Sequence, residues 1–241
     1  QVLNHTTFRD IICLINCKLR MKYHIGTKIL NKKLFVLKSK NLFIVRHGQT
    51  DYNKKKMVQG SGIDAPLNEE GRAQGRLFYE AYKDFPFDKI YVSGLIRTKQ
   101  SVEDFINDGI SYESLPGLNE ISWGSQEGMP FDEASHENYL SVTKAWSEGQ
   151  LDLRVGGGET PIEVMNRQKE AFQQIMAAED EQNVLICMHG RAMRVLFCWL
   201  LNYPLSNMDH FPHQNLCLYK LHFSGTVFSV DLVNEQSHML R

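Results

Sequence analysis

The stretch Leu42-Phe43-Ile44-Val45-Arg46-His47-Gly48 decides the fold that we predict for this 241-residue chain. Its four apolar residues are typical of a strand buried on both faces, and the polar residues after them indicate a loop. A second run, Val184-Leu185-Ile186-Cys187-Met188, ends in the same way at His189-Gly190. A third, Lys89-Ile90-Tyr91-Val92, ends at Ser93-Gly94. A helical pattern follows each run, so strand, loop and helix occur three times.

Two of the expected helices have clear starting signals. Asn68 is a good N-cap, and the acidic residues after it suit the positive end of the helix dipole. On this helix we expect one side to carry Ala73, Leu77 and Ala81. Thr160-Pro161-Ile162-Glu163 is a capping box with proline at the first helical position, and it opens a helix towards Ala178. We expect its buried side to include Ile162, Met165, Phe172 and Met176.

The end of the chain predicts a hairpin. Residues 216–223 and 227–233 alternate between apolar and polar, and Ser224-Gly225 joins them. After His189-Gly190, residues 191–201 are apolar enough to form a largely buried helix. Together the elements predict an α/β fold, a three-layer α/β/α sandwich with a mostly parallel central sheet. Such sheets bind their ligands at the carboxyl ends of the strands.

Composition places the chain among ordinary soluble globular proteins, with 42% hydrophobic residues, 23% charged residues and a formal net charge of -1. The charge is uneven, because residues 1–40 carry nine basic side chains against Asp10 alone, whereas residues 41–241 have an excess of acids. We expect residues 1–40 to be a basic N-terminal extension, poorly ordered or foreign to the native protein. Residues 41–241 are expected to form one domain, with no signal for nucleic-acid or membrane binding.

The five cysteines are an odd number and widely scattered, which favours a reducing compartment, and we expect a cytoplasmic location. Cys13 and Cys17 have the spacing of a metal-binding pair on a helix, but no further ligands complete such a site. The sequence therefore predicts neither structural disulfides nor a metal centre.

His47 and His189 each follow a predicted central strand and precede a glycine, with Arg46 and Arg191 beside them. Because the carboxyl ends of parallel strands meet at one edge of the sheet, we expect both histidines to face the same cleft. Arginine offers planar pairs of donors that match phosphate oxygens. The pattern favours a site that handles phosphate.

These residues and their surroundings resemble the motifs of the histidine phosphatase superfamily, which includes the cofactor-dependent phosphoglycerate mutases. The matching motifs, in order, are residues 42–50 with Asn53 and Gln59-Gly60 beyond them, residues 93–101 around Arg97, residues 118–124 around Glu120, residues 157–160, and residues 188–190 around His189. The resemblance covers roughly residues 41–233, which it identifies as a catalytic domain of the phosphoglycerate mutase-like fold.

The resemblance implies a phosphomonoester hydrolase that acts through a phosphohistidine on His47, with Glu120 as general acid and base. Arg46, Arg97 and His189 complete the expected catalytic set and grip the phosphoryl oxygens. Further contacts to the substrate phosphate are expected from Asn53, Gln59, Gly60, Gly190 and Arg191. We expect a small phosphorylated metabolite as the substrate, with no cofactor and no metal. His47 must be neutral while Glu120 is protonated, so activity is expected on the acidic to neutral side.

Two alternatives within this fold stay open. A mutase, primed by 2,3-bisphosphoglycerate, is disfavoured because residues 121–159 lack the adjacent arginine pair that mutases use there. That interval instead holds seven acids, namely Glu127, Asp132, Glu133, Glu137, Glu148, Asp152 and Glu159, which we expect to repel a densely anionic substrate. The other alternative is a noncatalytic binding member of the fold.

Other devices for phosphate chemistry fit less well. The arginine that a cysteine-based phosphatase needs after Cys187 is displaced by one position, to Arg194. A metal hydrolase built on His47 and His189 would place its metal ion beside arginines, whose positive charge repels a cation. Three more features stay open. Arg167 either contacts the substrate or pairs with an acid, and the lysine run 54–56 either lines the mouth of the site or is solvated. His210 and His213 are either a further metal-binding pair or part of a loop with Pro212.

Overall fold

The computed structural model describes residues 38–130 and 133–240, and for residues 133–136 it describes the backbone only. The strands are β1 (Lys40–Arg46), β2 (Lys89–Val92), β3 (Tyr112–Ser114), β4 (Asn183–Met188), β5 (Leu218–Phe223) and β6 (Phe228–Glu235). The helices are α2 (Asp51–Lys54), α3 (Glu69–Tyr82), α4 (Ile96–Ser101), α5 (Glu103–Asn107), α6 (Glu133–Ser147), α7 (Pro161–Ala177) and α8 (Gly190–Leu200). Short 3-10 turns cover η1 (Pro116–Leu118), η2 (Gly124–Gln126), η3 (Leu205–His210) and η4 (Ser237–Leu240).

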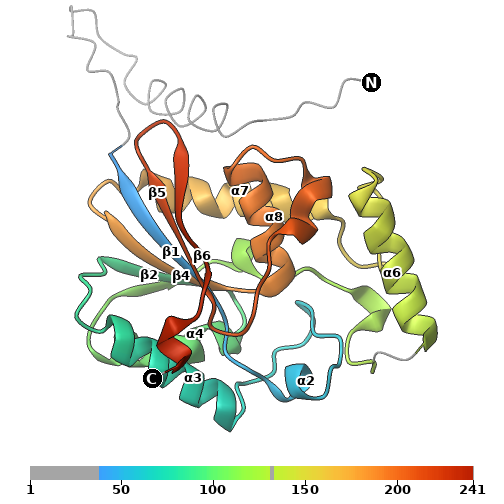
Figure 1. The fold of residues 1–241 in the computed structure, drawn as a ribbon, viewed down its shortest axis with the longest axis horizontal. Coiled ribbons are helices and arrows are strands. Elements are labelled where there is room, and N and C mark those ends of the chain that lie inside the picture. Colours follow the sequence, from blue (N-terminus) through green and yellow to red (C-terminus); the bar gives the residue numbers. More distant parts are fainter. Residues whose placement is uncertain (1–37, 131–132, 241) are drawn as a thin grey trace, which may run out of the picture.

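One six-stranded sheet forms the middle layer, in the order β3-β2-β4-β1-β5-β6. The strands β3, β2, β4 and β1 run parallel, and the hairpin β5-β6 adds antiparallel strands at the end. Helices α7 and α8 cover one face of the sheet, and α3 and α4 lie on the other (Figure 1). The predicted three-layer α/β/α sandwich with a mostly parallel sheet and a closing hairpin is confirmed.

The central strands β1 and β4 each carry a continuous apolar run because both of their faces are covered. Leu42 and Ile44 of β1 belong to the core shared with α7 and α8. Phe43 and Val45 belong to a second core on the side of α3 and α5. Each of these side chains is at most 2% exposed, and burial of such a side chain contributes about 1.5–3 kcal/mol. The alternation fixes the strand register, and the register in turn fixes where the loops after β1 and β4 begin.

The helix starts form as their signals predict. Asn68 accepts a hydrogen bond from the backbone N–H of Gly71, and Thr160 and Glu163 make the reciprocal capping box at the start of α7. On α3, Ala73, Leu77 and Ala81 are half-buried. The buried residues are Gly71, Gln74, Gly75 and Phe78. At Gly71 a Cβ would lie 2.1 Å from the carbonyl oxygen of Gln49, so α3 turns its small residues towards the loop after β1.

On α7 the expected Phe172 and Met176 are buried, whereas Ile162 and Met165 are half-buried and pack against the rim of the core. Strand β1 begins at Lys40, inside the segment expected to be an extension. The Lys40 ammonium group is 4% exposed and donates to the carbonyl oxygens of Ile175 and Ala178, so it caps the end of α7. Cys13 and Cys17 lie outside the described residues.

The sequence interpretation missed strand β3, helix α6 and the short helices α2 and α5. Strand β3 pairs with β2 at the edge of the sheet, and all three of its residues are exposed, so no apolar pattern announces it. Helix α6 lies beside the carboxyl ends of the parallel strands, as does α2 (Figure 1). Within residues 38–130 and 133–240, no helix is both long and apolar enough for a membrane span.

Candidate active site

The register between β1 and β4 brings the two signature histidines together. Arg46 pairs with Met188 in the last rung of the ladder, and the backbone N–H of His47 donates to the Met188 carbonyl oxygen at 3.0 Å. His47 and His189 therefore leave the sheet at the same edge, with their ring centroids 5.1 Å apart. Both rings are nearly inaccessible, at 3% and 0% exposed.

The hydrogen bond of the His47 ring defines its tautomer. Its Nδ1 lies 2.7 Å from the carbonyl oxygen of Gly48, and a carbonyl only accepts, so Nδ1 carries the hydrogen. The lone pair of the neutral ring is therefore on Nε2. Burial, and then the charges of Arg97 and Arg46, hold the pKa of His47 well below its ordinary range. The ring is in its nucleophilic form at neutral pH.

Arg97 is fully buried, and two backbone carbonyls orient its guanidinium group. Its guanidinium donates to Ile63 O at 2.7 Å and to Gly60 O at 3.2 Å, and its buried Nε has no hydrogen-bond partner among the described residues. Gly60 thus serves the site by holding Arg97. The Nε of Arg46 is likewise buried without a described partner. Burial lowers the pKa of Arg97 to about 10 and also lowers that of Arg46, as expected for cations gathered around an anion site.

Glu120 lies in the loop after η1, is 7% exposed, and its carboxylate contacts the start of α8. Its carboxylate accepts from the backbone N–H groups of Ala192 at 2.8 Å and Arg191 at 3.1 Å, and from that of Ile121 at 3.0 Å. These bonds orient the carboxylate at the positive end of a helix dipole. They also place it within the electrostatic reach of Arg46 and Arg97.

Arg167 is a positioning residue for Glu120. Its guanidinium donates to the backbone carbonyls of Gly117, Asn119 and Glu120 at 2.8–2.9 Å. It also pairs with Glu159 at 2.8 Å. These bonds hold the backbone of residues 117–120 in place. Arg167 therefore positions the Glu120 carboxylate through the backbone.

Ser93 is a site residue that the sequence interpretation missed. Its Oγ lies 2.8 Å from His189 Nε2 and accepts from the backbone N–H of Leu95. His189 Nδ1 is buried and has no hydrogen-bond partner in the described part of the chain. Burial and the neighbouring charges hold the pKa of His189 well below its ordinary range. The signal for Ser93 was its position directly after β2, which lies next to β4.

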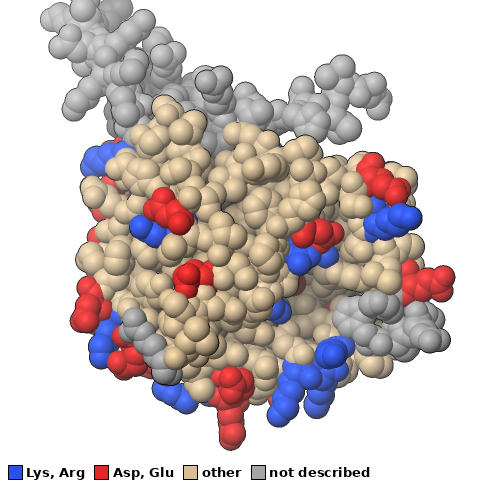
Figure 2. Space-filling model, viewed as in Figure 1, with Lys and Arg blue, Asp and Glu red and all other residues tan. Residues whose placement is uncertain are grey.

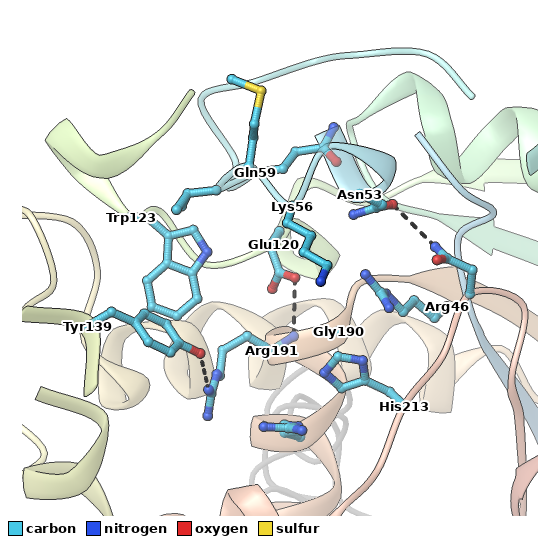
Figure 3. Close-up of a pocket in the computed structure, with 14 residues that line it drawn as sticks. Arg46, Asn53, Lys56, Gln59, Glu120, Trp123, Tyr139, Gly190, Arg191 and His213 are labelled. Atoms are coloured by element: carbon cyan, nitrogen blue, oxygen red, sulfur yellow. Dashed lines mark hydrogen bonds between the residues drawn. The ribbon is translucent and has the colours of Figure 1, made fainter. Parts of the chain in front are cut away.

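A cavity of about 410 Å³ opens above this group (Figure 3). Six of the predicted residues line it: Arg46, Asn53, Gln59, Glu120, Gly190 and Arg191. The other lining residues are Lys56, Met57, Val58, Trp123, Tyr139, Arg194, His213 and Asn215. His47, Arg97 and His189 are not among the residues that line the cavity. His47 follows the lining residue Arg46, His189 precedes the lining residue Gly190, and Arg97 is within electrostatic reach of Arg46 and Glu120. We call these three residues the base of the site. His210, by contrast, is exposed and does not line the cavity.

Asn53 and Gln59 use their amide oxygens within the protein. Asn53 Oδ1 accepts from the backbone N–H of Thr50 at 3.2 Å and from Asn215 Nδ2 at 3.3 Å. Gln59 Oε1 accepts from the Thr50 hydroxyl at 2.7 Å, and its buried Nε2 has no partner among the described residues. The donor ends of both amides are thereby left for a ligand. Asn215 also donates to His47 O at 2.9 Å and so ties the loop before β5 to His47.

Arg191 is largely committed to the protein. Its guanidinium donates to Asp209 at 2.6 Å and to the Tyr139 hydroxyl at 2.8 Å, and it lies over the ring of Trp123 at 5.9 Å. The side chain ties α8 to α6 and η3. Its backbone N–H, which holds Glu120, is its more direct link to the chemistry.

The geometry gives little support to a cysteine-based phosphatase or a metal hydrolase. Cys187 is fully buried, and burial raises the pKa of its thiol, so it is no candidate nucleophile. Across residues 38–130 and 133–240, no group of three or more His, Cys, Asp or Glu side chains is placed to hold a metal ion.

Comparisons with known proteins agree with this geometry. The model of the histidine phosphatase superfamily (branch 1) matches residues 42–236, and the chain belongs to this family. It is 34% identical to bovine fructose-2,6-bisphosphatase TIGAR over 152 residues, which are 59% of this chain but only 54% of TIGAR. It is 29% identical over 164 residues to a protein of Erwinia tasmaniensis named "Probable phosphoglycerate mutase GpmB", covering 68% of this chain and 75% of that one. The solved structure of Bacillus stearothermophilus YhfR superposes with a TM-score of 0.74 at 26% identity, covering 83% of this chain and 99% of YhfR.

Proposed function

We propose that this chain hydrolyses a phosphate monoester of a small metabolite through a phosphohistidine on His47. The observation that carries the proposal is the free Nε2 lone pair of a buried, neutral imidazole beside two arginines whose Nε groups have no described partner. Membership of the histidine phosphatase family supports it. The cavity of about 410 Å³ suits a small substrate.

In the first step, His47 Nε2 attacks phosphorus and forms a P–N bond while the bond to the leaving oxygen breaks. Glu120 gives its proton to that oxygen. Arg46, Arg97 and His189 stabilise the charge on the nonbridging oxygens, and the amide groups of Asn53 and Gln59 add donors. The alcohol then leaves through the open side of the pocket.

In the second step, water attacks the phosphohistidine. Glu120 takes a proton from the water, the P–N bond breaks, and its electron pair returns to Nε2 as inorganic phosphate forms. Arg167 contributes by holding the backbone at Glu120. No step draws on a metal or a cofactor.

A mutase shares the first step and returns the phosphoryl group to a second oxygen of the substrate. The absence of an adjacent arginine pair in residues 121–159 favours hydrolysis. Efficient isomerisation of 3-phosphoglycerate primed by 2,3-bisphosphoglycerate would reverse this preference. The buried free thiols of Cys187, Cys198 and Cys217 favour a cytoplasmic, reducing location.

The direct test is turnover of 4-nitrophenyl phosphate in the presence of a chelator. We expect the intact chain to release inorganic phosphate and the His47→Ala variant to lose the activity. His210→Ala, which changes an exposed histidine, is the matched control and should keep it. Equal rates for the intact chain and His47→Ala would refute the nucleophile.

A further inference from the structure

A buried histidine in the C-terminal turn η4 has no part in the proposed reaction. His238 is 1% exposed, and its ring packs edge-on against Phe78 and Tyr82 of α3, with centroids 5.2 Å and 6.0 Å apart. The turn lies beside α3 at the end of the chain (Figure 1). Residue 238 is beyond residues 42–236, which the family model matches, so family membership assigns it no role.

The His238 ring is hydrogen-bonded to a part of the chain that is distant in sequence. Its Nε2 lies 2.8 Å from the carbonyl oxygen of Leu216. Because a carbonyl only accepts, Nε2 carries the hydrogen. Leu216 is 0% exposed, and a buried carbonyl without a donor is costly. The histidine therefore meets a specific need of the peptide at Leu216.

Leu216 has a strained backbone conformation just before β5. Its φ is +52°, in the left-handed region that residues other than glycine adopt at a cost in energy. Such a conformation persists only where the surroundings hold it. At Leu216 the N–H donates to the carbonyl of Arg46 at 3.0 Å, and the carbonyl accepts from His238. His238 thus holds one side of a strained turn, and β1 holds the other.

The residues on either side of Leu216 contact the reacting groups. Asn215 donates to the carbonyl of His47 at 2.9 Å and to Asn53 Oδ1 at 3.3 Å. The carbonyl of Cys217 accepts from the backbone N–H of Arg46 at 3.4 Å. The conformation of residues 215–217 therefore sets where the backbone of the nucleophile and its neighbouring arginine lies.

We propose that His238 is a positioning residue for the active site. Through the carbonyl of Leu216 it holds residues 215–217 in the conformation that orients Arg46 and His47. Its effect on rate rests on the proposed hydrolysis, whereas its effect on the geometry of the phosphate site does not.

The turn η4 is itself anchored at both ends. The carboxylate of Glu235 accepts from the backbone N–H of Ser237, and the backbone N–H of Met239 donates to the carbonyl of Gln236 at 2.8 Å. The Met239 side chain packs against the core on the side of α3. These contacts hold the His238 ring at a fixed place relative to β5.

A role for η4 in binding a charged partner has less support. On the face drawn in Figure 2, acidic and basic side chains are interspersed, and the basic ones gather over α2 rather than over η4. The feature of η4 that bears on function is therefore its buried imidazole.

The test compares His238→Gln with His238→Met in the full chain. The two new side chains have nearly the same length and shape, but only glutamine offers an N–H to the Leu216 carbonyl. Turnover of 4-nitrophenyl phosphate is measured well below both melting temperatures, so that kcat reports on the folded enzyme. We expect kcat to fall about tenfold in His238→Met, because small displacements of reacting groups are costly, and glutamine should recover most of the loss.

A second measurement separates positioning from mere stabilisation. In an Asn215→Ala background the turn has lost its bond to His47, so His238→Met should lower kcat by a much smaller factor than in the intact chain. A purely stabilising histidine would give the same factor in both backgrounds. Met239→Ala, which loosens η4 but keeps the imidazole, is the matched control. It should lower the melting temperature and leave kcat nearly unchanged.

His238→Phe keeps the aromatic packing and loses the N–H, so it tests the bond without a flexible side chain in the core. It should match His238→Met in kcat. Equal kcat values for the glutamine and methionine variants would overturn the proposal. An unchanged kcat in His238→Phe, or equal factors in the two backgrounds, would do the same.

Calorimetric binding of inorganic phosphate makes the comparison without turnover. We expect the affinity to fall about fivefold in His238→Met and to be retained in His238→Gln, and equal affinities would also overturn the proposal. Failure of the proposed hydrolysis is seen separately, as equal turnover by the intact chain and His47→Ala.

Discussion

The base and the outer wall of the pocket are built in different ways. At the base, His47 and His189 follow paired strands, and Arg97 lies in the first helix after β2. Each is buried and oriented by backbone or hydroxyl partners. At the outer wall, Lys56 and His213 come from loops, and Tyr139 comes from α6. The parallel sheet thus fixes the reacting groups, and the connecting segments shape the part of the pocket that selects a substrate.

This difference predicts two kinds of mutational effect. Changes at the base should lower kcat, because in the proposed mechanism those groups act on the transferred phosphoryl group. Changes at the outer wall should alter KM and substrate preference while leaving the rate of the chemical step nearly intact.

The largest effect after loss of the nucleophile is expected for Arg97→Met. The variant removes a buried cation at the phosphoryl oxygens and also leaves the carbonyls of Gly60 and Ile63 without their donor. We expect kcat to fall about 10²–10³-fold. Arg72→Met, which alters an exposed arginine of α3, controls for the loss of charge alone. Steady-state kinetics of both variants decide the point, and a raised KM at unchanged kcat would place Arg97 outside the reacting set.

Glu120→Gln should lower kcat about 10²-fold for alkyl phosphates, which need a proton on the leaving oxygen. The loss should be smaller for 4-nitrophenyl phosphate, whose leaving group is stable as an anion. Glu148→Gln, at an exposed ion pair, is the control. Measuring both substrates gives a ratio that a purely structural defect does not change. An equal loss for both would argue against general-acid catalysis.

Ser93→Ala tests how the base is oriented. It removes the hydroxyl that contacts His189 Nε2, and we expect kcat to fall about tenfold with little change in stability. Ser93→Thr keeps a hydroxyl and should recover part of the loss. The kcat values and the melting temperatures are measured for both. No recovery by threonine, or a large fall in melting temperature, would indicate a packing role instead.

The pH profile of kcat/KM reports on His47. Its pKa is held well below the ordinary value near pH 6.5 because burial, Arg97 and Arg46 disfavour the charged ring. A lowered pKa keeps the nucleophile neutral at more acidic pH, so the acid limb should lie below pH ~6 once titration of the substrate phosphate is taken into account. An acid limb at or above pH ~6.5 would contradict a buried, arginine-flanked nucleophile.

The smallest effect is expected at the outer wall. Tyr139→Phe removes the hydroxyl that accepts from Arg191 but keeps the ring beside Trp123. We expect kcat for 4-nitrophenyl phosphate to change by less than about threefold, with a larger change in KM for bulkier substrates. Kinetics with a series of leaving groups measure this. A fall in kcat as large as that of Arg97→Met would abolish the distinction between base and wall.

The difference between the base and the outer wall also explains which site residues the sequence predicts. His47 and His189 were predictable because continuous apolar runs fix where parallel strands end, and the motifs around Arg97 and Glu120 add their partners. Ser93 and Asn215 act through hydrogen bonds to residues distant in the sequence, and the only sequence signal was the position of Ser93 directly after a predicted strand. The number of acids in residues 121–159 does not give their placement, and none of those whose side chains the structure describes lines the cavity. That Arg167 donates to backbone carbonyls becomes apparent only in the folded structure.

The central claim is a covalent bond between phosphorus and one imidazole. Rapid acid-free quench of the full chain with a ³²P-labelled phosphomonoester, followed by peptide mapping, tests it most directly. The account predicts an acid-labile, alkali-stable phosphoryl group on His47, formed and consumed at rates compatible with turnover. Turnover with no such adduct, or an adduct on another residue, would contradict it.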